Sequence, residues 1–464
     1  MKKTILLFVL IAQFIHSQNI TIFNDVPFYS MYHYLNQGNL DSEAFQNLPP
    51  EAFSQIPMGA IRSHAYERDV ISRKLTTTEI NSLGDNITLN VTLFAACDNY
   101  DRIAGVNLVL VPKNSTTYSW NATNIKRIEI GRFITPFMNK NISPTQVPFS
   151  WQINNLSKIL KDSALLLNYD MWIEFRADGY SAAAQNEVSG CANRTDVFRG
   201  SLELVTTNSG IPNTDIHLLE PIVYRFNFNN YQPNAFTNTY SNYTEKEFIV
   251  NLTEPIDNAK LYLITSKHGA NQGGEEYIRR YHYIYLNNNS VHSYVPNESP
   301  SCEPYRMYNT QGNGIYGANP QSDAWWSSWN NWCPGDKIPT KEIALGNLTA
   351  GQHTIKFRLS GANLFTSQQG SVSFSAYIQG KKTILNNEKF NENNFTFYPN
   401  PAQEEVFFNS ENKIKEIELF NSLGQSVLKS NETKLNLKKL SNGIYITKIS
   451  FLNGDISYSK IIKE

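Results

Sequence analysis

The sequence has no apolar run long enough to span a membrane as a helix, which needs about 20 residues. The run near its start, "ILLFVLIA" (5–12), is much shorter, and it lies between two lysines and the polar "HSQ". This order of a basic, an apolar and a small polar region is typical of a secretory signal peptide. We therefore expect residues 1–17 to be a signal peptide, and the mature protein to be exported and soluble.

An excess of one charge is also absent, because 40 basic and 41 acidic residues give a net charge of -1. Nothing in this balance indicates a nucleic-acid or anionic-membrane partner. The sequence contains no H-E-x-x-H, no G-x-S-x-G, no P-loop, no dinucleotide-binding motif and no His-x-His pair. His268 and His282 are isolated, which favours packed or substrate-facing histidines over metal ligands. We expect no metal and no cofactor.

Cysteine is scarce. The four cysteines are an even number in an exported chain, which favours disulfides, but three pairings are possible. No pair has C-x-x-C spacing, which argues against a structural zinc site. The simplest arrangement is one bridge in each half of the chain.

Aromatic residues are plentiful, at 12% of the chain, and most are Tyr and Phe, which favour strands. Short segments of alternating polar and apolar residues recur between 76 and 235, and a second set begins near 240. Turn residues separate them, so an all-β chain of antiparallel sandwiches or jelly rolls is expected. The segments include "NITLNVTLFA", "AGVNLVLV", "ALLLNYDMWIEF", "PIVYRFNF", "AKLYLITSKHG" and "SVSFSAYIQG".

The expected domain order follows from where this alternation starts and stops. Proline-punctuated residues 18–75 read as an N-terminal extension, and the polar segment 383–396 reads as a linker. Between them lie a first sandwich at 76–238 and a second at 239–382, and the tail 397–464 reads as a small β-sandwich. The long loop at about 290–340 contains two cysteines, so we expect it to be stapled and ordered.

Acidic side chains cluster at strand ends, where charges are commonly solvated or paired. Asp98 and Asp101 precede the strand that follows "CDNYDR", Asp170 lies in "NYDMWIEF", and Glu275 and Glu276 open "EEYIRRYHYIYLNN". Four tryptophans fall in "AWWSSWNNWC", within the long loop. We interpret them as a platform for sugar rings, with a small core beneath the loop as the alternative.

Four stretches together resemble the bacterial peptide-N-glycosidase F family over about residues 76–380. They are "CDNYDRIAGVNLVL", "EIGRFITPF", "EYIRRYHYIYLNN" and "WCPGDKIPT". The resemblance implies two adjacent eight-stranded antiparallel jelly rolls with an active site in the cleft between them. It also implies a hydrolase that cleaves the amide between asparagine and the first N-acetylglucosamine of an N-glycan, releasing the glycan and leaving aspartate.

The resemblance assigns roles by position. Asp101 matches the principal catalytic acid and Glu276 the second, with Asp170 as the third. It implies substrate contacts from Arg102, Trp172, Trp332, Tyr100 and His282, and a Cys302–Cys333 disulfide. Two departures stand out: position 170 is Asp where the family has Glu, and Gly274 and Ile278 replace two cysteines that flank the second acid.

The tail resembles the sorting domain of the type IX secretion system, through "YPNPA", "LFNSLGQSV", "GIYITKI" and "KIIK". This resemblance implies export across the outer membrane to the cell surface or medium, with the secretion machinery as one partner. N-glycosylated proteins or glycopeptides are the other expected partners of a monomeric enzyme.

Two alternatives stay open. The chain could be a glycan-binding protein without catalysis, in which the tryptophans and acids serve recognition. It could also be a glycoside hydrolase that cuts between the two core sugars, because paired carboxylates suffice for that reaction as well.

Overall fold

The structure is a computed structural model of the 464-residue chain. It describes residues 17–30, 56–62, 69–208, 215–229, 238–239, 243–269, 275–296, 301–312, 315–328, 330–360, 370–383 and 395–464. They belong to two compact units, Met1–Thr383 and Ile384–Glu464. Residues 1–16 of the expected signal peptide lie outside the described part. Within the described residues, no helix combines the length and the apolar character needed to cross a membrane.

The first unit contains two antiparallel β-sandwiches. One sheet of the first sandwich has four strands, in the order β1 (Gln18–Tyr29), β9 (Asp196–Thr207), β4 (Asn86–Ala95) and β7 (Gln146–Gln152). The facing sheet has six strands, in the order β16 (Lys337–Ile338), β6 (Lys126–Ile134), β5 (Ile103–Pro112), β8 (Tyr169–Ala177), β3 (Val70–Lys74) and β2 (Ala60–Ile61).

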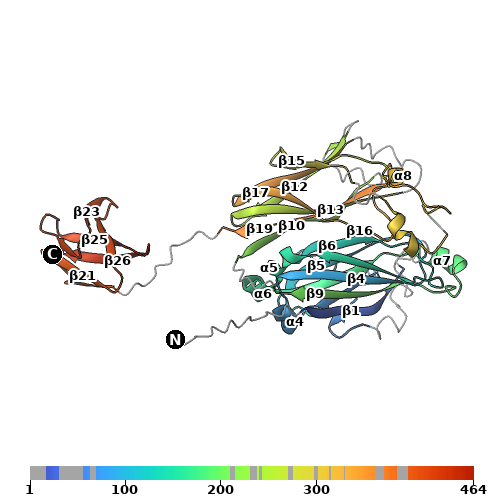
Figure 1. Cartoon of the computed structure of the whole chain (residues 1–464), viewed down its shortest axis with the longest axis horizontal. Helices are drawn as coiled ribbons and strands as arrows, with labels where there is room; N and C mark the ends of the chain where they lie inside the picture. The colour runs from blue at the N-terminus through green and yellow to red at the C-terminus, as the bar shows by residue number, and fades with distance from the viewer. Residues whose placement is uncertain are drawn as a thin grey trace, which may run out of the picture. The chain divides into compact units, whose positions relative to one another are not determined.

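The second sandwich follows the same plan. Its four-stranded sheet has the order β10 (His217–Asn229), β19 (Ser371–Lys382), β13 (Ile256–His268) and β17 (Lys341–Leu348). The five-stranded sheet has the order β11 (Asn238–Thr239), β12 (Tyr243–Leu252), β18 (Gly351–Ser360), β14 (His282–Leu286) and β15 (Asn289–Tyr294). The four sheets are stacked in layers, with β6 of the first sandwich beside β10 and β19 of the second (Figure 1).

Period-two alternation explains why these segments pack as strands. Ile87, Leu89, Val91 and Leu93 of β4 are at most 1% exposed, while the residues between them are not buried. One face of the strand therefore enters the core of the first sandwich. In the second core the rings of Phe228 and Phe374 lie 5.0 Å apart.

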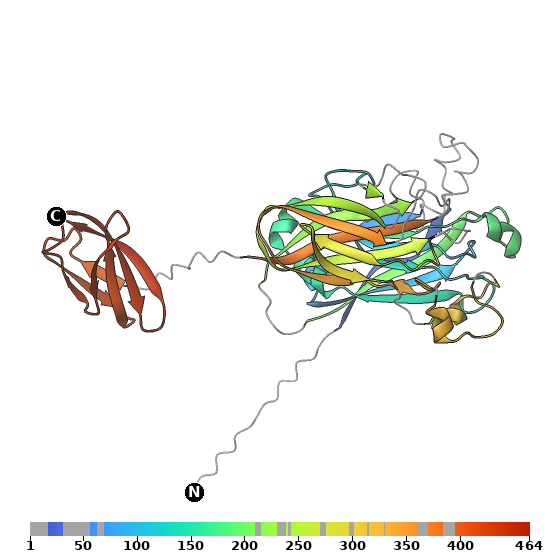
Figure 2. The same cartoon turned by 90° about the horizontal axis from the view of Figure 1, so that it is seen from above.

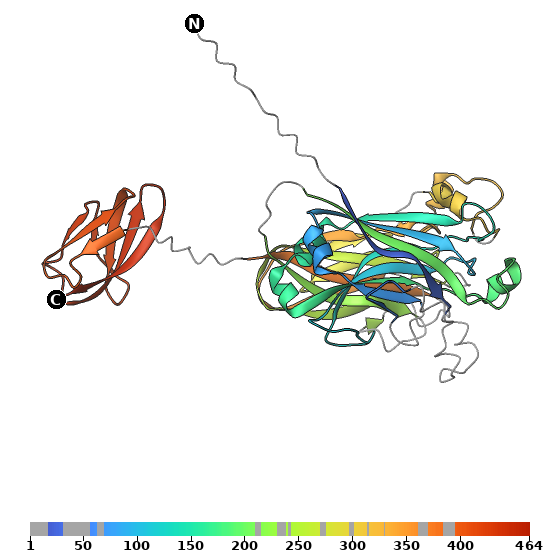
Figure 3. The ribbon, with the colours of Figure 1, turned by 90° about the horizontal axis from the view of Figure 1, so that it is seen from below.

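Short helices lie at the two ends of the unit. Figures 1, 2 and 3 place α7 (Ala182–Glu187) and the loop with α8 (Asp323–Trp326) at one end, and α6 (Ser163–Asn168) at the other. The other described helical segments are α4 (Thr77–Ser82), η1 (Asn154–Leu156), α5 (Ser157–Leu160) and η3 (Glu303–Tyr308). A capping box of Thr76 and Glu79 begins α4, so a helix starts directly after β3.

The C-terminal unit is a small sandwich. One sheet has the order β20 (Phe395–Tyr398), β21 (Glu405–Ser410) and β24 (Lys434–Asn436). The other has the order β23 (Ser426–Ser430), β22 (Ile414–Phe420), β25 (Gly443–Phe451) and β26 (Ile456–Lys463). Its own core includes Ile417, Ile449 and Ile461, all fully buried.

The all-β class with adjacent antiparallel sandwiches is confirmed, but three expectations about its parts are corrected. Strands β1 and β3 precede residue 76 and yet belong to the sheets of the first sandwich, so residues 18–75 are not wholly an extension. Strand β10 was grouped with the first sandwich, but it pairs with β19 of the second. Residues 163–168 form α6 rather than strand, because the Asp162 side chain caps the amides of Ala164 and Leu165.

Both disulfides follow the expected arrangement, one in each half of the chain. Cys97 is bonded to Cys191, and Cys302 to Cys333. The long loop is thereby closed across 31 residues of sequence. The second bridge agrees with the pairing that the resemblance implies.

Candidate active site

A cavity of about 430 Å³ opens between the two sandwiches. The first sandwich and its loops line it with Asp101, Arg102, Ile103, Ile134, Asp178 and Tyr180, and the second with His268, Glu276 and Trp332. Side chains from both sandwiches are needed to build it.

Asp98 anchors the segment that carries Asp101. Its carboxylate is fully buried and accepts two hydrogen bonds from Arg102, from Nε at 2.7 Å and Nη2 at 3.2 Å. It also accepts the backbone N–H of Tyr180 at 2.7 Å. Of the two carboxylates before β5, one is therefore used to hold Arg102 in place, and the other faces the cavity.

Asp101 and Glu276 line the same cavity, and the charge of Glu276 affects the ionisation of Asp101. Burial and the neighbouring charge of Glu276 together raise the pKa of Asp101 to about 7, against the opposing effect of Arg102. Burial also raises the pKa of Glu276, against hydrogen bonds from Tyr277 and the amide of Gly269. Both carboxyl groups therefore hold a proton to higher pH than an ordinary Asp or Glu.

The segment that carries Glu276 belongs to no strand or helix, so side chains hold it. The Nδ2 of Asn331 donates to the carbonyl oxygen of Glu276, and the buried Nζ of Lys267 donates to that of Ile278 at 2.7 Å. The amide of Gly269 reaches the Glu276 carboxylate itself at 3.1 Å. These contacts fix both the backbone and the head group of the second acid.

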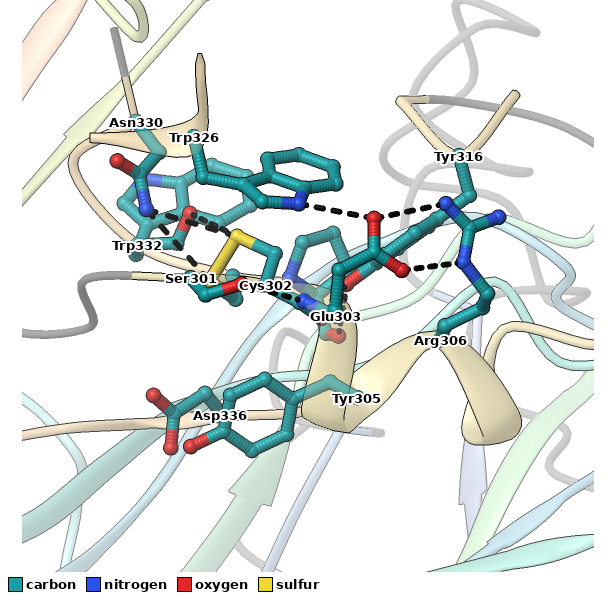
Figure 4. Close-up of a disulfide and its surroundings, with 12 residues drawn as sticks. Ser301, Cys302, Glu303, Tyr305, Arg306, Tyr316, Trp326, Asn330, Trp332 and Asp336 are labelled. Atoms are coloured by element: carbon teal, nitrogen blue, oxygen red, sulfur yellow. Dashed lines mark hydrogen bonds and ion pairs between the residues drawn. A yellow bond between two sulfur atoms is a disulfide. The ribbon is translucent and has the colours of Figure 1, made fainter. Parts of the chain in front are cut away.

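The loop closed by the Cys302–Cys333 disulfide leads into Asn331, and Figure 4 shows this disulfide with its surroundings. Trp326 is fully buried and packs in one cluster with the Cys302–Cys333 disulfide, and its Nε1 donates to Glu303 at 2.9 Å. The Nδ2 of Asn330 lies 3.6 and 3.7 Å from the two sulfur atoms. The disulfide thus fixes the residues that lead directly into Asn331 and Trp332.

Trp332 forms one wall of the cavity. Its Nε1 donates to the carbonyl oxygen of Lys267 at 2.6 Å, and its ring lies 5.8 Å from that of His268. Ile134 and Ile338 pack in the same cluster. Strand β16, which follows this loop, pairs with β6, so the loop joins the second sandwich to the first.

The structure brings four of the predicted site residues together, namely Asp101, Arg102, Glu276 and Trp332. Tyr100 lies next to them, with its ring 5.5 Å below the guanidinium carbon of Arg102, but it is not among the lining residues.

Asp170 and Trp172 lie elsewhere, which corrects their predicted place in the site. Asp170 follows α6 at the opposite end of the unit from α7, and it pairs with Lys74 at 3.1 Å and Lys113 at 2.9 Å (Figure 1). Asp170 and Asp178 are eight residue steps apart along the extended chain, about 26 Å at roughly 3.3 Å per residue. Trp172 is 1% exposed in a separate apolar cluster.

His282 was also expected to contact substrate, and this expectation is corrected. It is 1% exposed, and its ring lies 5.0 Å from Tyr294 and 5.6 Å from Phe374. It is therefore a packed residue of the second sandwich, the other possibility that the sequence left open.

Sequence reasoning missed Asp178 and Tyr180 and gave His268 no specific role. Asp178 follows β8, and the end of β8 lies beside the start of β5 in the antiparallel pair. Only this strand pairing could have indicated that Asp178 belongs to the site. Burial alone would raise the pKa of Asp178, but the guanidinium groups of Arg176 and Arg225 outweigh it and hold this pKa below its ordinary value. Besides Asp101 and Glu276, the cavity therefore contains a third carboxyl group, whose lowered pKa favours its ionised form.

The described tryptophans of the long loop lie in different surroundings and do not form one platform. Trp332 lines the cavity, Trp326 forms the small core under the loop, and Trp325 packs edge-on against Trp326 with 41% of its surface exposed. Trp329 lies outside the described residues. A stacking role for sugar rings stays a prediction for Trp332. Among the described residues, no group of three or more His, Cys, Asp or Glu side chains is arranged to hold a metal ion.

The fold and the cavity define a protein of two jelly-roll domains with a carboxylate-lined cleft between them. Family profiles agree: residues 20–186 match the N-terminal domain of peptide-N-glycosidase F, and residues 236–379 match its C-terminal domain. The chain belongs to the peptide-N-glycosidase F family. Residues 396–464 match a secretion-system C-terminal sorting domain, which marks the chain for secretion to the cell surface or beyond.

Solved structures of the same fold include PNGF-II in two crystal forms. The first is 21% identical with a TM-score of 0.55, and the second 20% identical with a TM-score of 0.51. Both matches cover 79% of this chain but only 66% and 65% of PNGF-II, so this chain spans slightly less than two thirds of its length.

PNGase F, a glycosylasparaginase from Flavobacterium meningosepticum, is 14% identical with a TM-score of 0.48, over 79% of this chain and 96% of that one. No curated protein sequence matches this chain.

Proposed function

We propose that the protein is a secreted peptide-N-glycosidase, which hydrolyses the amide between asparagine and the first N-acetylglucosamine of an N-glycan. The observation that carries the proposal is the meeting of Asp101 and Glu276, from different sandwiches, in one cavity with Trp332. Its substrates are N-glycosylated proteins or glycopeptides, and no cofactor takes part in the steps proposed below.

The reaction needs an activated water and a proton for the leaving nitrogen. Glu276 takes a proton from water, whose oxygen attacks the carbonyl carbon of the asparagine side chain. The carbon–nitrogen bond then breaks, and Asp101 gives its proton to the nitrogen, which leaves on the sugar. Aspartate remains on the peptide. The two acids suit this exchange, because their raised pKa values allow one of them to hold a proton near neutral pH while the other acts as the base.

The remaining lining residues are assigned to substrate. Arg102, held by Asp98, presents a charged donor for sugar hydroxyl or carbonyl oxygens, and the Trp332 ring offers an apolar face to a sugar ring. Asp178, ionised and at the cavity wall, would accept hydrogen bonds from sugar hydroxyl groups. We assign no role in the site to Asp170, Trp172 or His282.

One experiment separates the proposal from both alternatives. The purified protein is incubated with a defined N-glycopeptide, and the peptide product is analysed by mass spectrometry. The proposal predicts a free peptide with aspartate in place of asparagine. A peptide that keeps one N-acetylglucosamine would indicate a glycoside hydrolase instead, and binding with an unchanged peptide would indicate a glycan-binding protein.

A further inference from the structure

Two residues of the "EIGRFITPF" motif form a buried ion pair that has no part in the reaction steps proposed above. Its Glu129 and Arg132 are fully buried where β6 meets the second sandwich. Arg132 donates to Glu129 through Nε at 3.1 Å and Nη2 at 2.5 Å. Its Nη1 crosses to the second sandwich and donates to Ser266 Oγ at 2.8 Å and the carbonyl oxygen of Ser373 at 3.1 Å.

Ser266 links Arg132 to His268, which lines the cavity. Ser266 and His268 are two residues apart on β13 and so lie on the same face of the strand. Their Oγ and Nε2 atoms are 2.7 Å apart. Ser266 Oγ accepts a hydrogen bond from Arg132, and among the described residues its own hydroxyl hydrogen has no acceptor other than Nε2. This contact favours the neutral imidazole in which Nε2 accepts a hydrogen bond and the ring hydrogen is on Nδ1.

The surroundings keep this histidine neutral. Burial, together with the positive charges of Arg132 and Arg225, lowers the pKa of His268 to about 3, against the opposing effect of the Asp178 carboxylate. The adjacent Trp332 ring limits its rotation. Among the described residues, Nδ1 has no hydrogen-bond partner, while His268 lines the same cavity as Asp101 and Glu276.

We propose that His268 is a catalytic hydrogen-bond donor, whose Nδ1–H binds the carbonyl oxygen of the scissile amide. This inference rests on the proposed function. When water attacks the carbonyl carbon, negative charge develops on that oxygen, and a fixed donor stabilises it most in the transition state. The Arg132–Ser266 chain is the positioning device, because it fixes which nitrogen of His268 carries the hydrogen.

Three variants test the donor. In His268→Asn the side-chain amide nitrogen can occupy the place of Nδ1, in His268→Gln it can occupy that of Nε2, and His268→Ala has no donor. We expect His268→Ala and His268→Gln to lower kcat by roughly 100-fold or more with little change in KM, as for one lost oxyanion donor. His268→Asn should retain more activity than either. Melting temperatures of all three control for folding.

The activities of the parent and its variants distinguish a failure of the proposed function from a failure of the inference about His268. If the parent protein releases no glycan, the proposed function fails. If the parent is active and His268→Ala keeps its kcat, or His268→Gln exceeds His268→Asn, the inference about His268 fails alone.

A second measurement needs no variant to remain active. Nitrogen-15 NMR of histidine-labelled parent protein, with the His268 signal assigned by its loss in His268→Asn, reports the tautomer directly. We expect a neutral ring with its hydrogen on Nδ1 from about pH 5 upward. A signal from the Nε2-protonated tautomer or from imidazolium in that range would overturn the proposal.

Discussion

Replacing Arg132 with methionine tests the buried ionic network between the sandwiches. Glu129 and Arg132 are both fully buried. Although burial raises the pKa of Glu129, Arg132 and Arg225 outweigh it and hold this pKa at about 2. Relative to an ordinary glutamate pKa near 4.3, this corresponds to about 3 kcal/mol of stabilisation. The variant also leaves the oxygen of Ser373 without its arginine donor.

We expect Arg132→Met to lower the free energy of unfolding by about 3–5 kcal/mol, as when one partner of a buried pair is removed. Arg225 lies 3.1 Å from Glu129 and still pairs with it in the variant, which limits the loss of free energy of unfolding. The control is Lys260→Met, because Lys260 and Glu342 form an exposed pair with 47% and 52% of their side chains accessible. Loss of that pair should cost less than about 1 kcal/mol.

Urea unfolding followed by tryptophan fluorescence at neutral and acidic pH is the assay. The folded-state pKa of Glu129 is depressed, so its stabilisation is complete above the unfolded-state pKa near 4.3 and is lost as pH falls towards about 2. The difference in free energy of unfolding between the parent and Arg132→Met should become smaller as pH falls from about 4.3 towards about 2. A variant as stable as Lys260→Met at neutral pH would refute the account of this network.

Three further predictions concern the cavity. Asp170→Asn should keep the parental kcat on an N-glycopeptide, because Asp170 pairs with lysines outside the cavity; a loss above about tenfold would return it to the site. Asp101→Asn should raise the melting temperature at pH 8 but hardly at pH 4. The folded-state pKa of about 7 lies above the unfolded-state value near 3.9, so Asp101 costs stability progressively as pH rises between these two values, and the cost is complete above about 7. Equal effects of the substitution at both pH values would contradict this. Asn331→Ala should lower kcat and change KM little, because Glu276 loses the hydrogen bond that holds its backbone, and Asn331→Gln should restore part of the loss. A parental kcat in the alanine variant would show that this hydrogen bond is dispensable.

The sequence predicted strands well where one face is buried and the other is not. Residues 86–95 alternate in this way and form β4. Alternation identifies a strand but not its partner, so it could not assign β10 to the second sandwich. It also failed for the apolar run 163–168, where a helix cap at Asp162 decides the conformation.

The candidate site was predictable only in part, for the same reason. Asp101 and Glu276 were found through local motifs, but Asp170 and Asp178 stand at opposite ends of one strand. Only the antiparallel pairing of β5 with β8 shows which end meets the cavity. His268 was indistinguishable from His282 as an isolated histidine, because burial and the contact with Ser266 arise from tertiary packing.

The most direct test of the central claim is a double-mutant cycle of Asp101→Asn and Glu276→Gln, measured as kcat/KM for release of glycan from one N-glycopeptide. Each single change should reduce the rate by about 10²–10⁴-fold, with the melting temperature showing an intact fold. Because the pair works as one unit, the double variant should be little slower than the slower single variant. Single variants at the parental rate, or losses that simply multiply, would contradict the claim that these two acids act together.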